Sequence, residues 1–573
     1  MTLARIPFPP DWIRHYPREH LGTDLSAGLI VTVLVIPQSL AYALLAGLPP
    51  QMGLYVSIFP VIVYALLGSS RVQALGPVAL TAIMTASVLG PLAQPGTPHY
   101  VALAGALALM SGLMILAGGL LRLGFLSQLL SRPVISGFIS GSAVVIVVSQ
   151  LKSLLGLHTP ASGTWQTVLG LLPRLGDSHR PTVIIALAAL ALLAFARLGL
   201  QGLLTRLGMT AAAAAFVVRL MPLLVVLAGT LAVTQLDLDG RDGVAVVGPI
   251  VQGLPGLSLG LPPLGDLEKL IVPAFIMTLI GMVQNITMAQ ALAIKRRERI
   301  DPNAELVGLG AANVVSAFYG SMPVGGGLSR TAINVSAGAQ TPLASIVTAI
   351  AMIGVVAGAA HLFERLPLAV LAASITMAAV SMIDLKALRA AWQYDRADAL
   401  AWLGTAGGVL AFGLEAGIAL GVVLSMATLL YRASTPHIAV IGRIAGSEHF
   451  RNVDRHHVDT LPHALFMRID ESLFFGNLAA VEQRLNTALK QQPQTRDVVL
   501  VMNAINRMDA TAADVLAEHN RDLLGRGIRL HLAEIKGPVQ DRLMRSPLWK
   551  ELSGEVFLSA NGAFEALKTP AET

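Results

Sequence analysis

Long apolar runs separated by short polar loops fill the chain up to about Tyr431. A run of about 20 apolar residues can cross a bilayer as a helix. In the first half the predicted segments are Leu25–Leu48, Gly53–Gly68, Leu75–Gly90, Tyr100–Leu121, Pro133–Leu151, Pro181–Ala196 and Met221–Gln235. In the second half they are Leu270–Ile294, Glu305–Gly320, Ser329–Ala337, Pro342–Phe363, Leu366–Ile383, Leu400–Gly413 and Ala416–Leu430. The pattern predicts an α-helical polytopic membrane protein with fourteen transmembrane segments, seven in each half.

Two of these segments are interrupted at matching places, third and tenth. The third has Gly76-Pro77 near its start, and the tenth follows three glycines, Gly325 to Gly327. We also expect Pro37 to break the first segment and Pro222 to open the seventh. Short or Gly/Pro-interrupted segments at corresponding positions in two halves indicate the binding site of a transporter. The sequence therefore predicts two half-helices that face each other near the midplane.

Arg330 lies just after this glycine run. An arginine at bilayer depth costs about 2.5–3.5 kcal/mol even on lenient insertion scales. A helix that starts near Ser329 directs its free N–H groups and positive dipole end to the same place as the guanidinium. This arrangement attracts anions. The alternative is a structural arginine paired with carbonyl groups or with a carboxylate from another segment, since none lies between Glu305 and Glu364 in sequence.

The composition agrees with a membrane protein. The chain has 573 residues, 54% hydrophobic and 13% charged, against about 25% charged in soluble proteins, and its mean hydropathy is +0.67. It contains no cysteine, which excludes disulfides, thiolate metal sites and cysteine nucleophiles. Met1–His20 is polar and proline-rich, so we expect no cleavable signal peptide. The net charge of +6 fits loop topology better than nucleic-acid binding.

Loop charges predict both termini in the cytoplasm, because basic residues concentrate in cytoplasmic loops. The loops predicted to be inside contain Arg71, Arg122, Arg132, Arg197, Arg206, Arg219, Lys295, Arg296, Arg297, Arg299, Lys386, Arg389 and Arg396. The loops predicted to be outside contain Lys152, Arg174, Arg180, Arg241, Lys269 and Arg365. We expect a multi-pass protein of the cytoplasmic (inner) membrane.

A soluble domain follows the membrane segments, because charged residues become dense from Arg432 onward. The predicted divisions are an N-terminal cytoplasmic segment 1–20, a transmembrane domain 21–433, a polar connector 434–460 and a C-terminal domain 461–569. Strand-like runs at Ala464–Phe475, Asp497–Asn503 and Ile528–Leu532 alternate with helical patterns at Leu478–Gln491, Thr511–Leu524 and Pro538–Arg545. That alternation predicts a small α/β domain.

Four stretches resemble the SulP anion permeases, solute carrier family 26 in animals. They are IPQSLAY (36–42), SRPVISGFISGSAVVIVVSQLKSLL (131–155), NAELVGLGAANVVSAFYGSMPVGGGLSRTAIN (303–334) and LEAGIALGVVLSMATLLYRASTP (414–436). The resemblance implies an inverted repeat of seven plus seven spans, a core and a gate subdomain, a cytoplasmic STAS domain and a homodimer. It also implies an anion held between the half-helices of spans three and ten.

The same resemblance implies a set of anion-binding residues. These are Gln38 and Tyr42 from span one, the backbone at Val78 and Ala79 from span three, and Ser329, Arg330 and Thr331 from span ten. For Gln38 and Tyr42 the alternative role is polar contact between helices. Gly325–Gly327 are expected to serve close packing and the helix break.

One position departs from the family pattern. Many members carry a carboxylate on span eight where this chain has Gln284. A glutamine cannot titrate, so we expect no proton coupling through this position, and hypothesise that Gln284 is a neutral donor and acceptor. Anion exchange or uncoupled uptake would follow.

The loop INRMDATAADVL (505–516) resembles the motif of STAS domains. Soluble relatives carry a phosphorylated serine after the motif aspartate, but here Ala510 follows Asp509. Thr511 is the nearest hydroxyl, and we expect it to cap the next helix rather than accept phosphate. The domain is expected to act in dimerisation and regulation, with a possible cytoplasmic protein partner.

These features favour a carrier of small inorganic anions, with sulfate as first substrate. Bicarbonate, chloride or dicarboxylate are alternatives within the family, and a nucleobase symporter shares the architecture but is disfavoured by the SRTAIN motif at 329–334. A membrane scaffold or sensor acting through the STAS domain is the alternative of another class. We expect no enzyme activity, no cofactor and no metal site.

Overall fold

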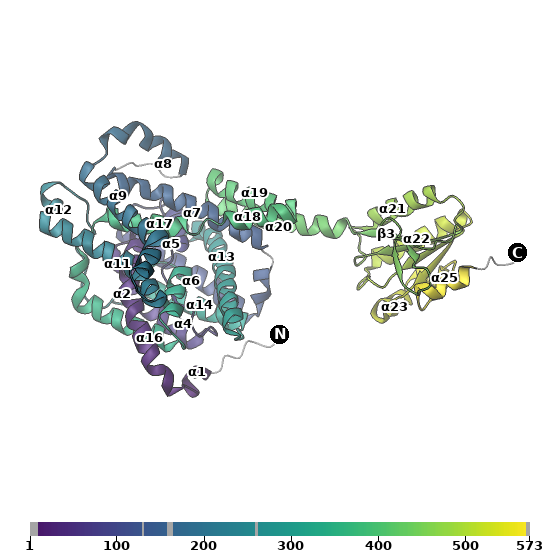
Figure 1. Cartoon of the computed structure of the whole chain (residues 1–573), viewed down its shortest axis with the longest axis horizontal. Coiled ribbons are helices and arrows are strands. Elements are labelled where there is room, and N and C mark those ends of the chain that lie inside the picture. The colour runs from purple at the N-terminus through teal and green to yellow at the C-terminus, as the bar shows by residue number, and fades with distance from the viewer. Residues whose placement is uncertain (1–9, 129–130, 158–163, 258–259, 261, 569–573) are drawn as a thin grey trace. The chain divides into compact units, whose positions relative to one another are not determined.

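The computed structural model describes residues 10–568 except 129–130, 158–163, 258–259 and 261. Residues 1–9 of the predicted N-terminal segment and residue 569 of the predicted C-terminal domain lie outside this part of the chain. The chain divides into two compact units, Met1–Ser425 and Met426–Thr573, which Figure 1 draws in purple to green and in green to yellow. Each unit is described by itself.

The first unit is built of helices. Its main helices before residue 240 are α2 (Leu21–Leu45), α3 (Pro50–Tyr55), α4 (Phe59–Leu67), α5 (Ala79–Leu89), α6 (Pro98–Leu120), α7 (Arg132–Leu155), α9 (Arg180–Phe195) and α11 (Ala211–Leu236). Those after it are α13 (Leu264–Arg296), α14 (Pro302–Phe318), α15 (Leu328–Ser336), α16 (Leu343–Gly354), α17 (Leu368–Val380) and α19 (Arg396–Phe412). α20 (Leu414–Ser434) crosses the boundary between the units. Shorter helices are α1 (Asp11–Arg14), α8 (Thr164–Leu171), α10 (Gln201–Arg206), α12 (Leu238–Arg241) and α18 (Leu385–Tyr394).

Each of the fourteen predicted segments contains a helix, but their lengths differ. Within the described residues, ten helices are long and apolar enough to cross a membrane, and α5 is shorter. The total of fourteen spans therefore stays a prediction. Two prolines act differently from expectation: α2 continues through Pro37, and α11 begins at Ala211 and contains Pro222. A membrane helix can continue through a proline when neighbouring groups form hydrogen bonds with the backbone carbonyl that the proline leaves without its donor.

Glycines let two helices of this unit approach closely. α6 packs along α14, and a Cβ atom added at Gly310 would lie 2.4 Å from the backbone nitrogen of Leu116. A Cβ at Gly112 would lie 2.8 Å from the nitrogen of Val314. Small residues at such contacts are what drives helix packing in lipid.

Two short strands, one from each half of the first unit, pair with each other. β1 (Leu75–Gly76) pairs antiparallel with β2 (Gly325–Gly326), with Leu75 opposite Gly326 and Gly76 opposite Gly325. β1 leads into α5, which has 11 residues, and β2 leads into α15, which has 9. The two interrupted segments predicted from sequence are thus short helices that begin at one strand pair.

The second unit is an α/β domain with a six-stranded sheet in the order β4-β3-β5-β6-β7-β8. The strands are β3 (Ile438–Arg443), β4 (Phe450–Asn452), β5 (Ala464–Ile469), β6 (Asp497–Val501), β7 (Arg529–Ala533) and β8 (Val556–Phe557). The helices are α21 (Leu478–Gln491), α22 (Ala510–Gly525), α23 (Gly537–Leu543), α24 (Pro547–Glu551) and α25 (Ala560–Lys568). Pairing is parallel from β5 to β8 and antiparallel at β3 and β4.

The range 434–460, predicted to be a polar connector, contributes two strands to this sheet. β3 pairs with β5 through Ile438 opposite Ile469, and β4 pairs with β3. β4 is only three residues long, and β3 is followed by the loop 444–449, so neither strand stands out from the polar range around it. Long-range pairing with β5 fixes them instead.

Candidate functional site

Two helix N-termini flank the β1–β2 pair. α5 begins at Ala79 with Val78 as its N-cap residue, and α15 begins at Leu328 with Gly327 as its N-cap residue. Neither start has a side-chain cap, and neither helix has an acidic residue in its first turn. Helix starts without a side-chain cap have first N–H groups and a positive dipole end that are suited to interact with an anion.

Arg330, in the first turn of α15, is buried with 4% of its surface exposed. Its Nη1 donates to the carbonyl oxygen of Leu75 at 2.9 Å and to Ser57 Oγ at 3.4 Å, and its Nη2 donates to Ser39 Oγ at 3.1 Å. All three partners are neutral oxygen atoms. Among the described residues no carboxylate pairs with Arg330, so its positive charge is hydrogen-bonded but not neutralised by an ion pair.

Other side chains of α15 also bond to the extended segment 72–75 that precedes α5. Thr331 Oγ1 accepts a hydrogen bond from the nitrogen of Ala74 at 3.1 Å, and Asn334 Nδ2 donates to the carbonyl oxygen of Val72 at 2.9 Å. The hydroxyl of Thr331, predicted to bind the anion, is thus engaged by backbone. α15 is held to the first half by several bonds along one stretch of backbone.

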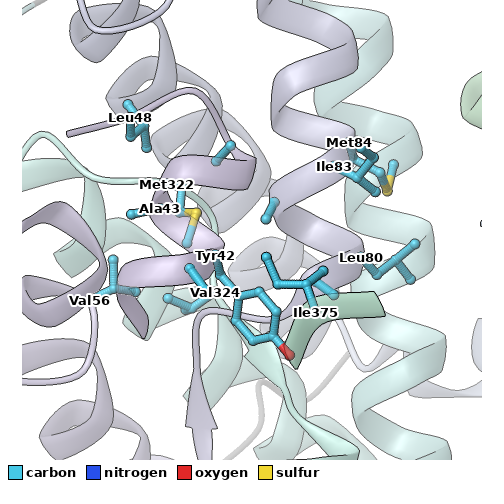
Figure 2. Packing of buried hydrophobic residues seen from close by; sticks show 14 of the residues in the cluster. Tyr42, Ala43, Leu48, Val56, Leu80, Ile83, Met84, Met322, Val324 and Ile375 are labelled. Atoms are coloured by element: carbon cyan, nitrogen blue, oxygen red, sulfur yellow. The ribbon is translucent and has the colours of Figure 1, made fainter. Parts of the chain in front are cut away.

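Tyr42 and Gln38 lie on α2 near this region. Tyr42 is buried in an apolar cluster that includes Ala79, Val324 and Ile375, and Figure 2 shows its ring near Val324 and Ile375. Gln38 is half-buried and immediately precedes Ser39, which bonds to Arg330. Span one therefore reaches the arginine through Ser39.

Gln284 on α13 lies next to β2. Its Nε2 is 3.5 Å from the carbonyl oxygen of Gly326, at the outer limit of a hydrogen bond. The amide faces the glycine strand between the two halves, at the position where a carboxylate was expected from the family pattern. In this chain it presents a neutral group there.

A second polar network lies behind the strand pair and centres on Glu305, which is fully buried at the start of α14. Its carboxylate accepts hydrogen bonds from the nitrogens of Ser69 and Ser70 at 2.8 and 2.7 Å, and from Tyr64 Oη at 2.6 Å. Asn285 Nδ2 also donates to it at 3.1 Å.

This network extends to the glycine strand. Gln73 Nε2 donates to Asn285 Oδ1 at 2.5 Å. A Cβ at Gly326 would lie 2.3 Å from that Gln73 nitrogen. The network therefore connects α14, α13 and the segment before β1.

The predicted site residues fall into two groups. Val78, Ala79, Gln284, Arg330 and Thr331 lie around the β1–β2 pair, whereas Tyr42 and Gln38 approach from α2. The side chain of Ser329 lies outside the described side chains. Ser39, Ser57, Gln73, Asn285 and Asn334 are contacts of the site that sequence reasoning missed.

No metal-binding cluster accompanies the site. In the described part of the chain, no group of three or more His, Asp or Glu residues is placed to hold a metal ion. The arrangement offers N–H donors, one guanidinium and neutral polar groups, which are the ligands of an anion.

In the second unit, the STAS-like loop leads into α22. Asp509 is the N-cap residue, and its carboxylate accepts hydrogen bonds from the nitrogen of Ala512 at 2.8 Å and of Phe475 at 3.0 Å. Asp509 rather than Thr511 therefore caps this helix, because the carboxylate of an N-cap residue accepts a hydrogen bond from the backbone N–H three residues further along the chain. A cavity of about 410 Å³ lies beside the loop, lined in part by Asp514, Arg542 and Arg545.

Comparison with family models matches both units. The model described as "Sulfate permease family" matches residues 21–405, and that of the STAS domain matches residues 456–563. A probable sulfate transporter of Mycobacterium tuberculosis is 34% identical over 560 residues, which cover 97% of this chain and 97% of that protein. These matches confirm the resemblance drawn from the sequence motifs.

Two solved structures share the fold. Murine solute carrier 26 family member A9, an anion transporter in the inward-facing state, has a TM-score of 0.85 and 20% identity, over 97% of this chain and 93% of that chain. The transmembrane domain of a cyanobacterial bicarbonate transporter has a TM-score of 0.59 and 24% identity, over 72% of this chain and 98% of that chain. The predicted fold class, a polytopic helical membrane protein with a C-terminal STAS domain, is confirmed.

Proposed function

We propose that this chain, which belongs to the sulfate permease family of anion transporters, carries sulfate across a membrane by alternating access. The observation that carries the proposal is Arg330, a buried guanidinium that donates to neutral oxygens beside two uncapped helix starts. Keeping a charge at bilayer depth costs a few kcal/mol. An anion that binds there recovers part of this cost through charge-assisted hydrogen bonds.

Six further residues are proposed to shape the same site, namely Tyr42, Gln38, Val78, Ala79, Ser329 and Thr331. The starts of α5 and α15 supply backbone N–H groups, and Tyr42 forms an apolar wall with Val324 and Ile375. Bicarbonate, chloride and dicarboxylates are the competing substrates, and the name of the cyanobacterial neighbour points to bicarbonate for that protein.

Gln284 suggests how the carrier is driven. Its amide lies beside Gly326 and cannot take up a proton at neutral pH. We propose that transport proceeds by anion exchange or uncoupled uptake at this position. The remaining proposals are a homodimer in the inner membrane, cytoplasmic termini and a regulatory STAS domain.

Uptake of labelled sulfate into proteoliposomes tests the proposal. Arg330→Ala should lower uptake at least tenfold, because a hydrogen bond to a charged group contributes about 1.5–3 kcal/mol. Arg197→Ala is the matched control, since Arg197 also donates to a carbonyl oxygen, that of Met377, but is exposed. Uptake by the control should stay within about twofold of the parent protein, as for most surface substitutions.

Two results would contradict the proposal. Unchanged sulfate uptake by the Arg330→Ala variant would make the arginine structural. Absence of flux for every anion offered to the parent protein, under any gradient, would favour the scaffold or sensor instead.

A further inference from the structure

Two buried serines contact Arg330 and each other. Ser39 on α2 and Ser57 in the turn between α3 and α4 are both fully buried, and their Oγ atoms are 3.0 Å apart. Some buried serines in this unit bond within their own helix; for example, Ser142 Oγ donates to the carbonyl oxygen of Phe138 at 2.7 Å. Ser39 instead contacts Ser57 and the guanidinium.

The two hydroxyls share a set of hydrogen bonds. Ser57 is placed to donate to the carbonyl oxygen of Gly53 at 3.2 Å, and either hydroxyl can donate across the Ser39–Ser57 contact. Both hydroxyl oxygens accept from Arg330. The complete chain leads from the guanidinium through two hydroxyls to a backbone carbonyl.

These contacts use one side of the guanidinium. Arginine has five N–H groups in a planar fork, and the three bonds to Leu75, Ser57 and Ser39 all start at Nη1 or Nη2. A hydroxyl pair 3.0 Å apart spans the Nη1/Nη2 edge. Within the described residues, no hydrogen bond engages Nε.

We propose that Ser39 and Ser57 are positioning residues that fix the Arg330 guanidinium so that its Nε/Nη2 edge receives the anion. Two parallel N–H groups on one edge match two oxygens of one oxyanion, a bidentate geometry that a monatomic anion cannot use. The substrate class is therefore an oxyanion such as sulfate rather than a halide. The inference rests on the proposed function of Arg330.

The serines also limit how strongly the anion is held. With Nη1 fully occupied by Leu75 and Ser57, only one edge of the guanidinium is left for the substrate. Conduction and transport need binding weak enough for release. The hydroxyl pair thus fixes the direction in which the guanidinium points and leaves only one of its edges to bind the anion.

The test compares two anions in variants of the serine pair. In proteoliposomes, the KM for sulfate and the inhibition constant of chloride are measured for Ser39→Ala/Ser57→Ala, for each single variant, and for Ser142→Ala as the control. Loss of the pair should raise the KM for sulfate about tenfold, as expected when a bond to a charged group is lost. The inhibition constant of chloride should change less than about twofold, since a spherical ion needs no fixed edge.

Ser39→Thr keeps a hydroxyl, so with Ser57 intact this variant should retain the sulfate preference of the parent protein. If the double variant does not fold, the single variants and Ser39→Thr carry the same comparison. Equal changes for sulfate and chloride, or no change in their ratio, would overturn the proposal and leave the serines as packing residues.

Arg330→Ala measured in parallel separates the two proposals. If Arg330→Ala leaves uptake unchanged, the proposed function of the site fails. If Arg330→Ala abolishes uptake while the serine variants keep the sulfate-to-chloride ratio, only the positioning role fails.

Discussion

Arg330 Nη1 donates to the carbonyl oxygen of Leu75 at 2.9 Å, and the guanidinium lies directly against the next residue, Gly76. A Cβ atom added at Gly76 would be 1.7 Å from Nη1. The half-helix of one half of the chain is therefore fixed to the strand of the other half where only glycine fits.

Gly76→Ala should displace the guanidinium and lower sulfate uptake by at least about tenfold, because a contact this short forces the side chain to move. Gly407→Ala on α19 is the control, since nothing lies within 4 Å of a Cβ atom there. Uptake and detergent-solution melting are measured for both. Parent-like uptake by Gly76→Ala would show that the arginine can move without loss of function.

Gln284→Glu should introduce dependence on pH. The new carboxyl would lie near Gly326 and could take up a proton, whereas the native amide does not titrate. We expect sulfate uptake by this variant to respond to an imposed proton gradient and the parent protein to respond less. One-for-one proton coupling in the parent would contradict the proposed role of Gln284.

Glu305→Ala should destabilise the first unit strongly. The substitution leaves the nitrogens of Ser69 and Ser70 and the hydroxyl of Tyr64 without their acceptor. Each buried donor left unpaired costs about 1–3 kcal/mol, so a total loss of at least about 3 kcal/mol is expected. Thermal unfolding in detergent measures it, with the exposed Glu268→Ala as control.

Glu305→Gln keeps one carbonyl acceptor, so its unfolding temperature should lie between those of the parent and the alanine variant. A Glu305→Ala protein that melts with the parent would show that water replaces the carboxylate in this network.

Asp470 in the second unit should make the stability of the STAS domain depend on acid pH. Partial burial raises the pKa of Asp470, but hydrogen bonds from Arg468 and His437 outweigh it, so that the pKa lies below its ordinary value. The distances are 2.5 Å from Arg468 Nε and 2.8 Å from His437 Nδ1.

A carboxyl with a depressed pKa stabilises the folded state above its unfolded pKa, near 3.9, and this contribution is lost as the pH falls through the folded pKa. Asp470→Asn should therefore lower the unfolding temperature of the STAS domain at pH 6 to 7. The difference from the parent should shrink as the pH falls below about 4. Calorimetry of the full-length protein checks this, and a constant difference at every pH would contradict it.

The sequence predicted the long helices and the two interrupted segments, because apolar length and Gly/Pro breaks are local signals. Arg330 was also identified locally, as a charge in an apolar chain. Ser39 and Ser57 were not, because a serine in a lipid-embedded helix usually bonds to its own backbone. Their role depends on α2, the α3–α4 turn and α15 meeting in space.

The same limit explains two of the other differences. The hydroxyl of Thr331 turns to Ala74, and β3 and β4 are fixed by pairing with strands far along the chain. Asp509, two positions before Thr511, is the residue that caps α22, and the motif alone does not resolve that difference in register. Contacts between distant segments decide the first two cases, and a local difference in register decides the third.

The pairing of β1 with β2 has a consequence for synthesis of the chain. Leu75 and Arg330 are 255 residues apart. At about 5–20 residues per second, the segment 72–76 is made tens of seconds before its partners. The first half-helix therefore enters the membrane without its final neighbours, and the proposed anion site is completed only when the second half has been inserted.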